Sequence, residues 1–532
     1  MKKMPLGIQT FRDIVEGGYV YVDKTQYIYN LINDASYYFL SRPRRFGKSL
    51  LLDTIAEAFG GDKELFKGLY IYDSDFSFDK LPVLRLDMSN ISTETPEILK
   101  KGLLIDLVSR AKKEGFDIDY GIPSAIFKAL IEGLYEKYNK RVVVLIDEYD
   151  KPILDRISDV EIAEGNRDVL REFYGVLKSM DPYLRLTFIT GVTKFTKTSV
   201  FSGLNNLWDI TMTKKYANIC GITKEDLRKH FNEHIEYLVS LDGFDSYERV
   251  NDGILEWYDG YSWDGETRVI NPFSLLYFFC EKKFSGFWYA SGTPKFLLDL
   301  IKNRPDGYTG LNNIEMGEWE LDTFDIRKME AGPLLFQTGY LTVKSVLPGQ
   351  APAVYLLEVP NFEVRMAFNL HLLAEFTESG NALAGSAYRK IKESLVTGDL
   401  QNILITLRAL FASIPYEIHM KHEYYYHSIF YAIMNLLGFD VDAEVSVSGG
   451  RIDAVLELDD KVYVMEFKYE NCPPDASPEE KQKLFGKALD EGIKQIKDRG
   501  YTKKYLGSDK EIYQVTFAFL GRDDIEMMIQ KS

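Results

Sequence analysis

The sequence has few residues that could build a disulfide framework or a zinc cluster. Three cysteines, Cys220, Cys280 and Cys472, occur in 532 residues, and no two of them form a C-x-x-C pair. Their odd number and wide spacing exclude a small disulfide-stapled fold and give no zinc or redox motif. Because such cysteine usage is typical of a reducing compartment, we expect a cytoplasmic protein.

Long apolar runs and an excess of positive charge are also missing. No run approaches the roughly 18 apolar residues of a membrane-spanning helix, and the basic first residues precede no apolar export segment, so we expect no membrane partner and no export signal. The formal net charge is −16. This charge opposes non-specific adhesion to nucleic acid, because Lys and Arg supply most of the affinity for a polyanion. Any nucleic-acid binding must therefore be local.

The chain is long enough for about three domains, at roughly 100 to 200 residues each. We expect an N-terminal domain at 1–212, a mainly helical lid or coupling region at 213–380, and a C-terminal part at 381–532 with its core at 420–520. Within the middle region, the apolar run 334–343 with Gly339 is either a strand with a bulge or close backbone approach, or a packing element.

Four short apolar runs in the first domain are predicted to be buried strands, at 37–41, 81–88, 141–146 and 184–191. Helical patterns separate them. Strands that alternate with helices predict a mostly parallel sheet covered on both faces, with ligands at the carboxyl ends of its strands.

A phosphate-binding loop is predicted directly after the first of these strands. Backbone N–H groups at the start of the following helix, 49–59, would hold phosphate oxygens. Lys48 would reach the β- and γ-phosphates, and the Ser49 hydroxyl would ligate Mg²⁺. Arg42 stands where glycine is usual, so the loop must turn differently or begin its turn later. A basic helix start that binds an acidic surface is the alternative. The loop comprises Arg42, Pro43, Arg44, Arg45, Phe46, Gly47, Lys48 and Ser49.

Two carboxylates end a buried strand further along the chain. The apolar residues 142–146 lead into Asp147 and Glu148. Asp147 can hold the Mg²⁺ shell, and Glu148 can orient an attacking water. Alternatively, the pair begins the next helix as an N-cap and a first-turn acid. Together with the upstream loop, the pair favours an ATP site.

These residues resemble bacterial and archaeal AAA-ATPase-like proteins. The resemblance rests on the loop sequence R-P-R-R-F-G-K-S and on L-I-D-E-Y-D-x-P at 145–152, and it covers roughly residues 5 to 210. It implies an AAA-like P-loop domain that binds ATP and Mg²⁺. A polar γ-phosphate sensor often ends the next strand in such ATPases, so Thr190 and Thr193 are candidates, although these hydroxyls would equally suit a strand-end turn. Since P-loop ATPases of this kind often form rings or dimers, a homo-oligomer is among the expected assemblies.

The C-terminal part is predicted to be a compact α/β module with a hairpin at its centre. After a helix that ends at 437, strands are expected at 441–447, 451–458, 462–469 and 512–520, with a helix at 478–500. A two-residue turn at 459–460 would set Asp453 opposite Glu466 on the two central strands.

The opposed carboxylates of Asp453 and Glu466 predict a metal site. Two like charges that close repel each other unless a cation lies between them, which favours Mg²⁺ or Mn²⁺. Lys468 shares the sheet face of Glu466, since side chains alternate along a strand, and it would position the attacking water. The alternative is a solvated hairpin with exposed acids and a lysine.

The same residues resemble the PD-(D/E)XK nuclease superfamily, specifically the module often fused to these AAA-like ATPases. The resemblance spans roughly residues 420 to 520 and rests on G-G-R-I-D, which ends at Asp453, and on M-E-F-K, which contains Glu466 and Lys468. It implies a restriction-endonuclease-like α/β fold in which the two acids bind the metal and Lys468 assists hydrolysis. Glu423 matches a further acid of related members. Gln495 matches the glutamine of a Q-h-x-x-Y helix motif, whose tyrosine is replaced here.

Both sites together predict an α/β protein that is an ATP-binding, Mg²⁺-dependent nuclease. Its substrate would be nucleic acid, DNA rather than RNA, and the nucleotide state of the first domain would control cleavage. The lysine-rich stretch 481–504 is either a phosphate-binding surface or a solvated helix face. The alternative functions are a nucleotide-dependent signalling switch or nucleic-acid sensor that binds without cutting, and a scaffold with vestigial sites.

Overall fold

The chain divides into two compact units in the computed structural model. The first comprises 1–290 with 313–361, and the second 291–312 with 362–532. The domain boundaries that we expect after residues 212 and 380 stay predictions. The structure describes residues 1–118, 121–195, 200–201, 203–241, 243–288, 314–321, 326–327, 330–349, 351–368, 386–387, 389–391, 393–394, 397, 399–412, 441–447, 450–457, 460–473, 476–507, 509–520 and 524–532.

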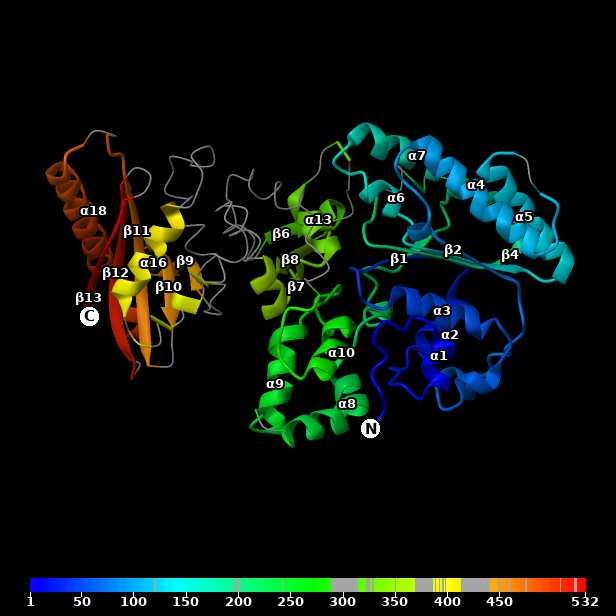
Figure 1. The fold of residues 1–532 in the computed structure, drawn as a ribbon, viewed down its shortest axis with the longest axis horizontal. Helices are drawn as coiled ribbons and strands as arrows, with labels where there is room; N and C mark the ends of the chain where they lie inside the picture. The colour runs from blue at the N-terminus through cyan, green and yellow to red at the C-terminus, as the bar shows by residue number, and fades with distance from the viewer. Residues whose placement is uncertain are drawn as a thin grey trace. The chain divides into compact units, whose positions relative to one another are not determined.

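A five-stranded parallel sheet forms the centre of the first unit (Figure 1). Its strand order is β2-β3-β4-β1-β5. The four expected strands are confirmed to within two residues. Strands β1, β3 and β4 are almost wholly buried, because helices cover both faces, and such strands are continuous apolar runs. The strands are β1 Tyr37–Ser41, β2 Val83–Asp87, β3 Val142–Asp147, β4 Leu184–Gly191 and the short β5 Trp208–Asp209.

Helices lie on both faces of this sheet. Figure 1 shows α4, α5, α6 and α7 on one face and α1, α2 and α3 on the other. Helix α4 begins where proline follows the N-cap Thr95, whose side chain accepts a hydrogen bond from the backbone N–H of Ile98. The helices are α1 Phe11–Glu16, α2 Thr25–Asp34, α3 Lys48–Ala58, α4 Pro96–Lys113, α5 Pro123–Tyr138, α6 Lys151–Leu154 and α7 Val160–Ser179.

The rest of the first unit is mainly helical, as expected. Helices α8 Lys224–Val239, α9 Tyr247–Tyr258 and α10 Pro272–Glu281 share an apolar core. A small antiparallel sheet with the order β6-β8-β7 accompanies them. Its strands and the neighbouring short helices are β6 Ile314–Gly317, α12 Glu318–Leu321, α13 Ala331–Thr338, β7 Thr342–Val346 and β8 Val354–Glu358.

The prediction of a strand at 334–343 is wrong for most of that run. Leu334 lies in α13, and this helix ends at Gly339, whose φ of 92° suits glycine at a helix C-cap. The close backbone approach is confirmed, because a Cβ at Gly339 would lie 2.8 Å from the Cβ of Pro43. Gly339 therefore lets the middle region pack against the predicted phosphate loop.

The second unit contains a mixed five-stranded sheet with the order β13-β12-β11-β10-β9. Strands β11 and β12 run parallel, and α18 connects them, packing on both (Figure 1). The expected strands and this helix are confirmed, whereas the helix expected to end at 437 lies outside the described residues. The elements are α16 Leu400–Ala412, β9 Val441–Val447, β10 Gly450–Glu457, β11 Lys461–Glu470, α18 Pro478–Asp498, β12 Glu511–Leu520 and β13 Asp524–Lys531.

Within the part of the chain that the structure describes, no helix combines the length and the apolar character needed to cross a membrane.

Candidate functional sites

The predicted phosphate loop turns later than the usual pattern. Within the described loop, positive φ angles occur at Arg45 (72°) and Gly47 (89°), and Arg42 is not among them. Gly47 precedes α3, and a Cβ there would meet nothing within 4 Å. The expectation that the loop begins its turn after position 42 is confirmed, and open space lies beside the helix start.

Arg42 is a buried anchor of this loop. Its guanidinium donates hydrogen bonds to the carbonyls of Ser41 and Thr211, both at 2.9 Å, and two further carbonyls lie within 3.5 Å. The same group lies 3.9 Å from the ring centroid of Trp263. Burial lowers the pKa of Arg42 to about 10. Because its guanidinium binds these carbonyls, Arg42 can contact a nucleotide only through its backbone.

Lys48 lies inside its own loop. The buried ammonium donates to the carbonyls of Arg42 at 2.9 Å and Pro43 at 3.0 Å. Burial lowers the pKa of Lys48, and the nearby carboxylates, Asp147 first among them, oppose that shift. The ammonium is thus held beside the carboxylates that the sequence places in the same site.

The carboxylates at the end of β3 lie where β4 can reach them, because β4 is the neighbour of both β1 and β3. The Thr190 hydroxyl donates to Asp147 at 2.7 Å, and the backbone N–H of Glu148 donates to the same oxygen at 3.0 Å. Burial raises the pKa of Glu148. The pair does not begin the next helix, since α6 starts at Lys151. The N-cap alternative for this pair is therefore wrong.

Asp150 was not predicted as a site residue, although it belongs to the quoted L-I-D-E-Y-D-x-P segment. Its buried carboxylate accepts hydrogen bonds from the backbone N–H of Thr193 at 2.6 Å and from the Thr193 hydroxyl at 2.7 Å. It also accepts one from the backbone N–H of Val192. The hydroxyl of Thr193 thus satisfies a strand-end turn, while that of Thr190 contacts the predicted Mg²⁺ ligand.

An apolar cavity of about 110 Å³ adjoins the phosphate loop. Gly47 of the loop and Leu51 of α3 form one side of it. The other sides come from the segment before α2 and from the middle region, and they include Tyr21, Ile222 and Phe231. The cavity is therefore lined by three segments that lie far apart in the sequence.

The central hairpin of the second unit has the predicted register. Ala454 of β10 pairs with Met465 of β11. Continued by one residue, this antiparallel register sets Asp453 opposite Glu466, as expected from the turn. The Asp453 carboxylate accepts a hydrogen bond from the backbone N–H of Phe467 at 2.9 Å.

Four of the predicted residues come together around Glu466, which is 1% exposed. Lys468 donates to Glu466 and to the side-chain oxygen of Gln495, both at 3.0 Å. The Gln495 amide donates to the same oxygen of Glu466. Burial, and then the Asp453 carboxylate, raise the pKa of Glu466 to about 7, while Lys468 opposes the shift. Glu423 lies outside the described residues.

The donor set around Glu466 fits Mg²⁺. One oxygen of Glu466, Oε2, is buried without a hydrogen-bond partner in the described part of the structure. Mg²⁺ takes one or two protein carboxylates and fills its other positions with water and substrate phosphate. Asp453 and Glu466 are the two carboxylates that the sequence predicts as ligands here, and no group of three metal-ligating side chains is found among the described residues.

Some lysines of the lysine-rich stretch 481–504 form ion pairs with acidic side chains. Lys481 lies 2.7 Å from Asp524, and Lys487 lies 3.1 Å from Glu470. Arg499, which replaces the expected tyrosine, donates to the Tyr501 hydroxyl at 3.0 Å. For Lys481 and Lys487, these pairs favour a solvated helix face over a phosphate-binding surface.

The comparisons with known proteins agree with both resemblances. Residues 5–201 match the family model described as a predicted AAA-ATPase, and residues 421–528 match that of the PD-(D/E)XK nuclease superfamily. An "Uncharacterized protein in vnfD 5'region" from Azotobacter chroococcum mcd 1 is 37% identical over 525 residues, which are 97% of this chain and 96% of that protein. The chain belongs to this AAA-ATPase-like family. Its nuclease superfamily domain lies at the C-terminus.

Gly492 lets α18, which carries Gln495, pack closely against the sheet. A Cβ at Gly492 would lie 2.3 Å from Cγ2 of Thr516 on β12. We expect Gly492→Ala to displace α18, to destabilise the second unit by about 1–3 kcal/mol, and to reduce any cleavage that depends on Gln495. Thermal unfolding and cleavage rates measure both effects.

Gly486→Ala is the matched control in the same helix of this AAA-ATPase-like protein. A Cβ at Gly486 meets nothing within 4 Å, so alanine there should leave stability unchanged or raise it by up to about 1 kcal/mol. Equal effects of the two substitutions would show that close packing at Gly492 does not matter.

Proposed function

We propose that this AAA-ATPase-like protein is an ATP-binding, Mg²⁺-dependent nuclease that hydrolyses phosphodiester bonds of nucleic acid, DNA in preference to RNA. The nucleotide state of the N-terminal domain controls the C-terminal nuclease. One observation carries the proposal: Asp453 faces a buried Glu466, and one oxygen of Glu466 has no partner among the described residues. The preference for DNA rests on the resemblance alone.

The nuclease residues have separate roles in this proposal. Asp453 and Glu466 hold Mg²⁺ or Mn²⁺, which supplies a more acidic water and neutralises phosphate charge when bound. Lys468 is 22% exposed on its side chain, so its ammonium can contact the scissile phosphate and stabilise the charge that develops there. Gln495 orients Lys468 through their 3.0 Å hydrogen bond.

The ATP site uses the loop and the ends of two strands. Lys48 and the backbone N–H groups after Gly47 bind the phosphates, and Ser49 with Asp147 holds the nucleotide Mg²⁺. Glu148, whose pKa is raised by burial, orients a water for hydrolysis. The apolar cavity beside Gly47 accepts the base.

The middle region contacts both loops that would surround ATP, which supports the control of cleavage by nucleotide. The backbone N–H of Lys194 donates to Gln337 at 2.9 Å, and the Gln337 amide donates to the carbonyl of Leu321 at 2.9 Å. The Trp288 indole donates to the carbonyl of Arg44 in the phosphate loop at 3.1 Å. A nucleotide that binds these loops in one conformation biases the middle region towards that conformation.

Gln337→Leu tests this coupling. The substitution removes both hydrogen bonds of Gln337 and leaves the phosphate loop intact. We expect ATP still to bind, with a thermal shift close to that of the wild type, whereas the dependence of the cleavage rate on ATP is lost. Cleavage measured with and without ATP gives the result.

Gln337→Glu is the control for that substitution. It keeps the acceptor for the Lys194 N–H, but it replaces the donor to Leu321 with a carboxylate oxygen and adds a negative charge, so only part of the ATP dependence should remain. If ATP changes cleavage by the same factor in Gln337→Leu as in the wild type, Gln337 does not couple the two domains.

The proposed function is tested with linear, circular and single-stranded DNA and with RNA, in Mg²⁺ or Mn²⁺, with and without ATP. We expect cleavage of at least one DNA form, and nucleotide-dependent thermal protection that Lys48→Ala abolishes. Binding of nucleic acid without cleavage in either metal would favour the switch or sensor instead. If Lys48→Ala changes neither nucleotide binding nor cleavage, the proposed ATP control is wrong.

A further inference from the structure

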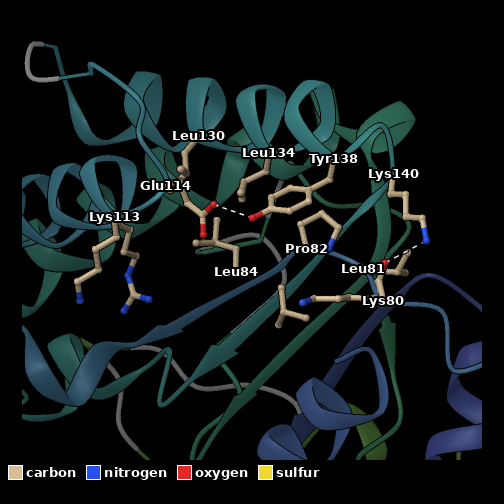
Figure 2. Close-up of a pocket in the computed structure, with 12 residues that line it drawn as sticks. Lys80, Leu81, Pro82, Leu84, Lys113, Glu114, Leu130, Leu134, Tyr138 and Lys140 are labelled. Carbon is tan, nitrogen blue, oxygen red and sulfur yellow. Dashed lines mark hydrogen bonds between the residues drawn. The ribbon is translucent and has the colours of Figure 1, made fainter. Parts of the chain in front are cut away.

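A second cavity of the first unit lies at the opposite end of the sheet from the ATP site. It has a volume of about 520 Å³ and is bounded by the ends of α4 and α5 and by the start of β2 (Figure 2). Lys140, on its wall, comes just before β3, whereas Asp147 ends that strand. At about 3.3 Å per residue, the strand separates the two positions by roughly 20 Å. The cavity is therefore distinct from the nucleotide site.

Four cations surround this cavity in a chain whose formal net charge is −16. Arg110 pairs with Asp106 at 2.7 Å. Among the described residues, no carboxylate pairs with the other three, although Lys140 donates to the backbone carbonyl of Lys80 at 3.2 Å. Figure 2 shows Lys113 on one side of the cavity and Lys80 with Lys140 on the other. The cations are Lys80, Arg110, Lys113 and Lys140.

The one carboxylate among the lining residues, Glu114, is already paired. It accepts a hydrogen bond from Lys137 at 2.8 Å. It accepts another from the Tyr138 hydroxyl at 3.0 Å (Figure 2). Lys137 lowers the pKa of Glu114, so this carboxylate stays charged and paired. Glu114 is thus engaged by partners of its own, and it is the one carboxylate among the residues that line the cavity.

The wall between the cations is apolar and partly aromatic. Leu84, Leu130 and Leu134 are buried beneath the cavity, and Tyr138 is 43% exposed beside it. In Figure 2, the Tyr138 ring lies close to the ring of Pro82. A flat, exposed aromatic ring beside cations is the arrangement on which nucleobases stack while their phosphates contact lysine.

Only two of the four cations can be explained by the stabilisation of a helix end. Arg110 and Lys113 belong to the last turn of α4 and favour its C-terminal dipole end. Lys80 and Lys140 precede strands β2 and β3 and gain nothing from that dipole. An acidic peptide would satisfy the cations but would not need the exposed ring of Tyr138.

We propose that this cavity binds a nucleoside phosphate, with the phosphate held by Lys113 and the base stacked on Tyr138, while Lys80 and Lys140 add positive charge on the other side of the cavity. The ligand is either a free nucleotide or a nucleotide within a single-stranded nucleic acid. Such a site lets the ATPase domain sense a nucleotide that is neither its ATP nor the strand being cut. The proposal goes beyond the function proposed above and does not depend on cleavage.

The test uses full-length protein carrying Lys48→Ala and Asp453→Asn, in EDTA, so that the other two sites contribute little. Fluorescence anisotropy measures binding of a labelled short single-stranded DNA, and calorimetry measures binding of AMP. In this background, Lys113→Glu is expected to weaken at least one probe about tenfold at low salt. For the DNA probe, it should also reduce the salt slope by about 1. Tyr138→Ala should weaken the same probe.

Lys229→Glu is the matched control, because it makes the same charge change at an exposed residue of α8, away from the cavity. Loss of AMP binding in Lys113→Glu assigns the site to a free nucleotide, and loss of DNA binding alone assigns it to a strand. Equal effects of Lys113→Glu and Lys229→Glu overturn the proposal. So does displacement of the DNA by an acidic peptide as effectively as by unlabelled DNA of the same charge, or binding of neither probe.

Discussion

Asp453→Asn is expected to lower nucleic-acid cleavage in Mg²⁺ by about 1000-fold or more, a size typical of removing a group that holds the catalytic metal or moves a proton. The fold should survive, because the asparagine oxygen can still accept the hydrogen bond from the backbone N–H of Phe467 that Asp453 accepts at 2.9 Å. What is lost is the charge that, with Glu466, balances a divalent cation. Calorimetry with Mn²⁺ alone should show weakened binding, and thermal protection by ATP should be unchanged.

Asp460→Asn is the control for this result. Asp460 is an exposed acid near the turn of the same hairpin and pairs with Lys461 at 2.7 Å, so it undergoes the same chemical change away from Glu466. Its cleavage rate should match that of the wild type. If Asp453→Asn retains both the cleavage rate and the Mn²⁺ affinity of the wild type, the proposed metal site is wrong.

The hairpin shows why part of the second site can be predicted from sequence. Side chains alternate strictly along a strand, so a two-residue turn fixes which residues face each other, and the observed pairing of Ala454 with Met465 follows that register. Gln495 could not be placed by such counting, because it comes from a helix; only the resemblance made it a site residue, and its contact with Lys468 was not predicted. Strand β13, Asp524–Lys531, was missed because its half-buried residues show no alternation.

The first site depends more on contacts between distant segments, which no local pattern contains. The buried strands β1, β3 and β4 were predictable because both of their faces are covered by helices, which makes them continuous apolar runs. The contact of Lys194 with Gln337 spans 143 residues, and Trp263 beneath Arg42 is similarly remote. The run at 334–343 was ambiguous because a short apolar segment suits a buried helix as well as a strand. The helix ends at Gly339, where φ is 92°, and the packing of Gly339 against Pro43 is a contact that no local pattern contains.

Arg42→Gly restores the glycine that is usual at this loop position, yet we expect it to destabilise the first unit by about 3–5 kcal/mol. The substitution removes the donors to the carbonyls of Ser41 and Thr211 and leaves a cavity under Trp263. Buried carbonyls without donors are costly, and glycine offers no compensating freedom, since residue 42 has no positive φ to accommodate. Denaturant unfolding should show a lower midpoint, and ATP affinity should fall rather than rise.

Arg44→Gly separates this effect from a general change in loop flexibility. Arg44 is exposed, two residues along the same loop, and its loss should cost no more than about 1 kcal/mol through the unfolded chain. Arg42→Lys should be intermediate, because an ammonium keeps the charge but cannot reach several carbonyls with one rigid planar group. If Arg42→Gly unfolds at the wild-type midpoint and binds ATP more tightly, Arg42 is a removable obstacle. If its midpoint falls well below that of Arg44→Gly, the presence of arginine in place of glycine is explained. The Arg42 side chain then stabilises the loop by anchoring it to the buried residues around Trp263.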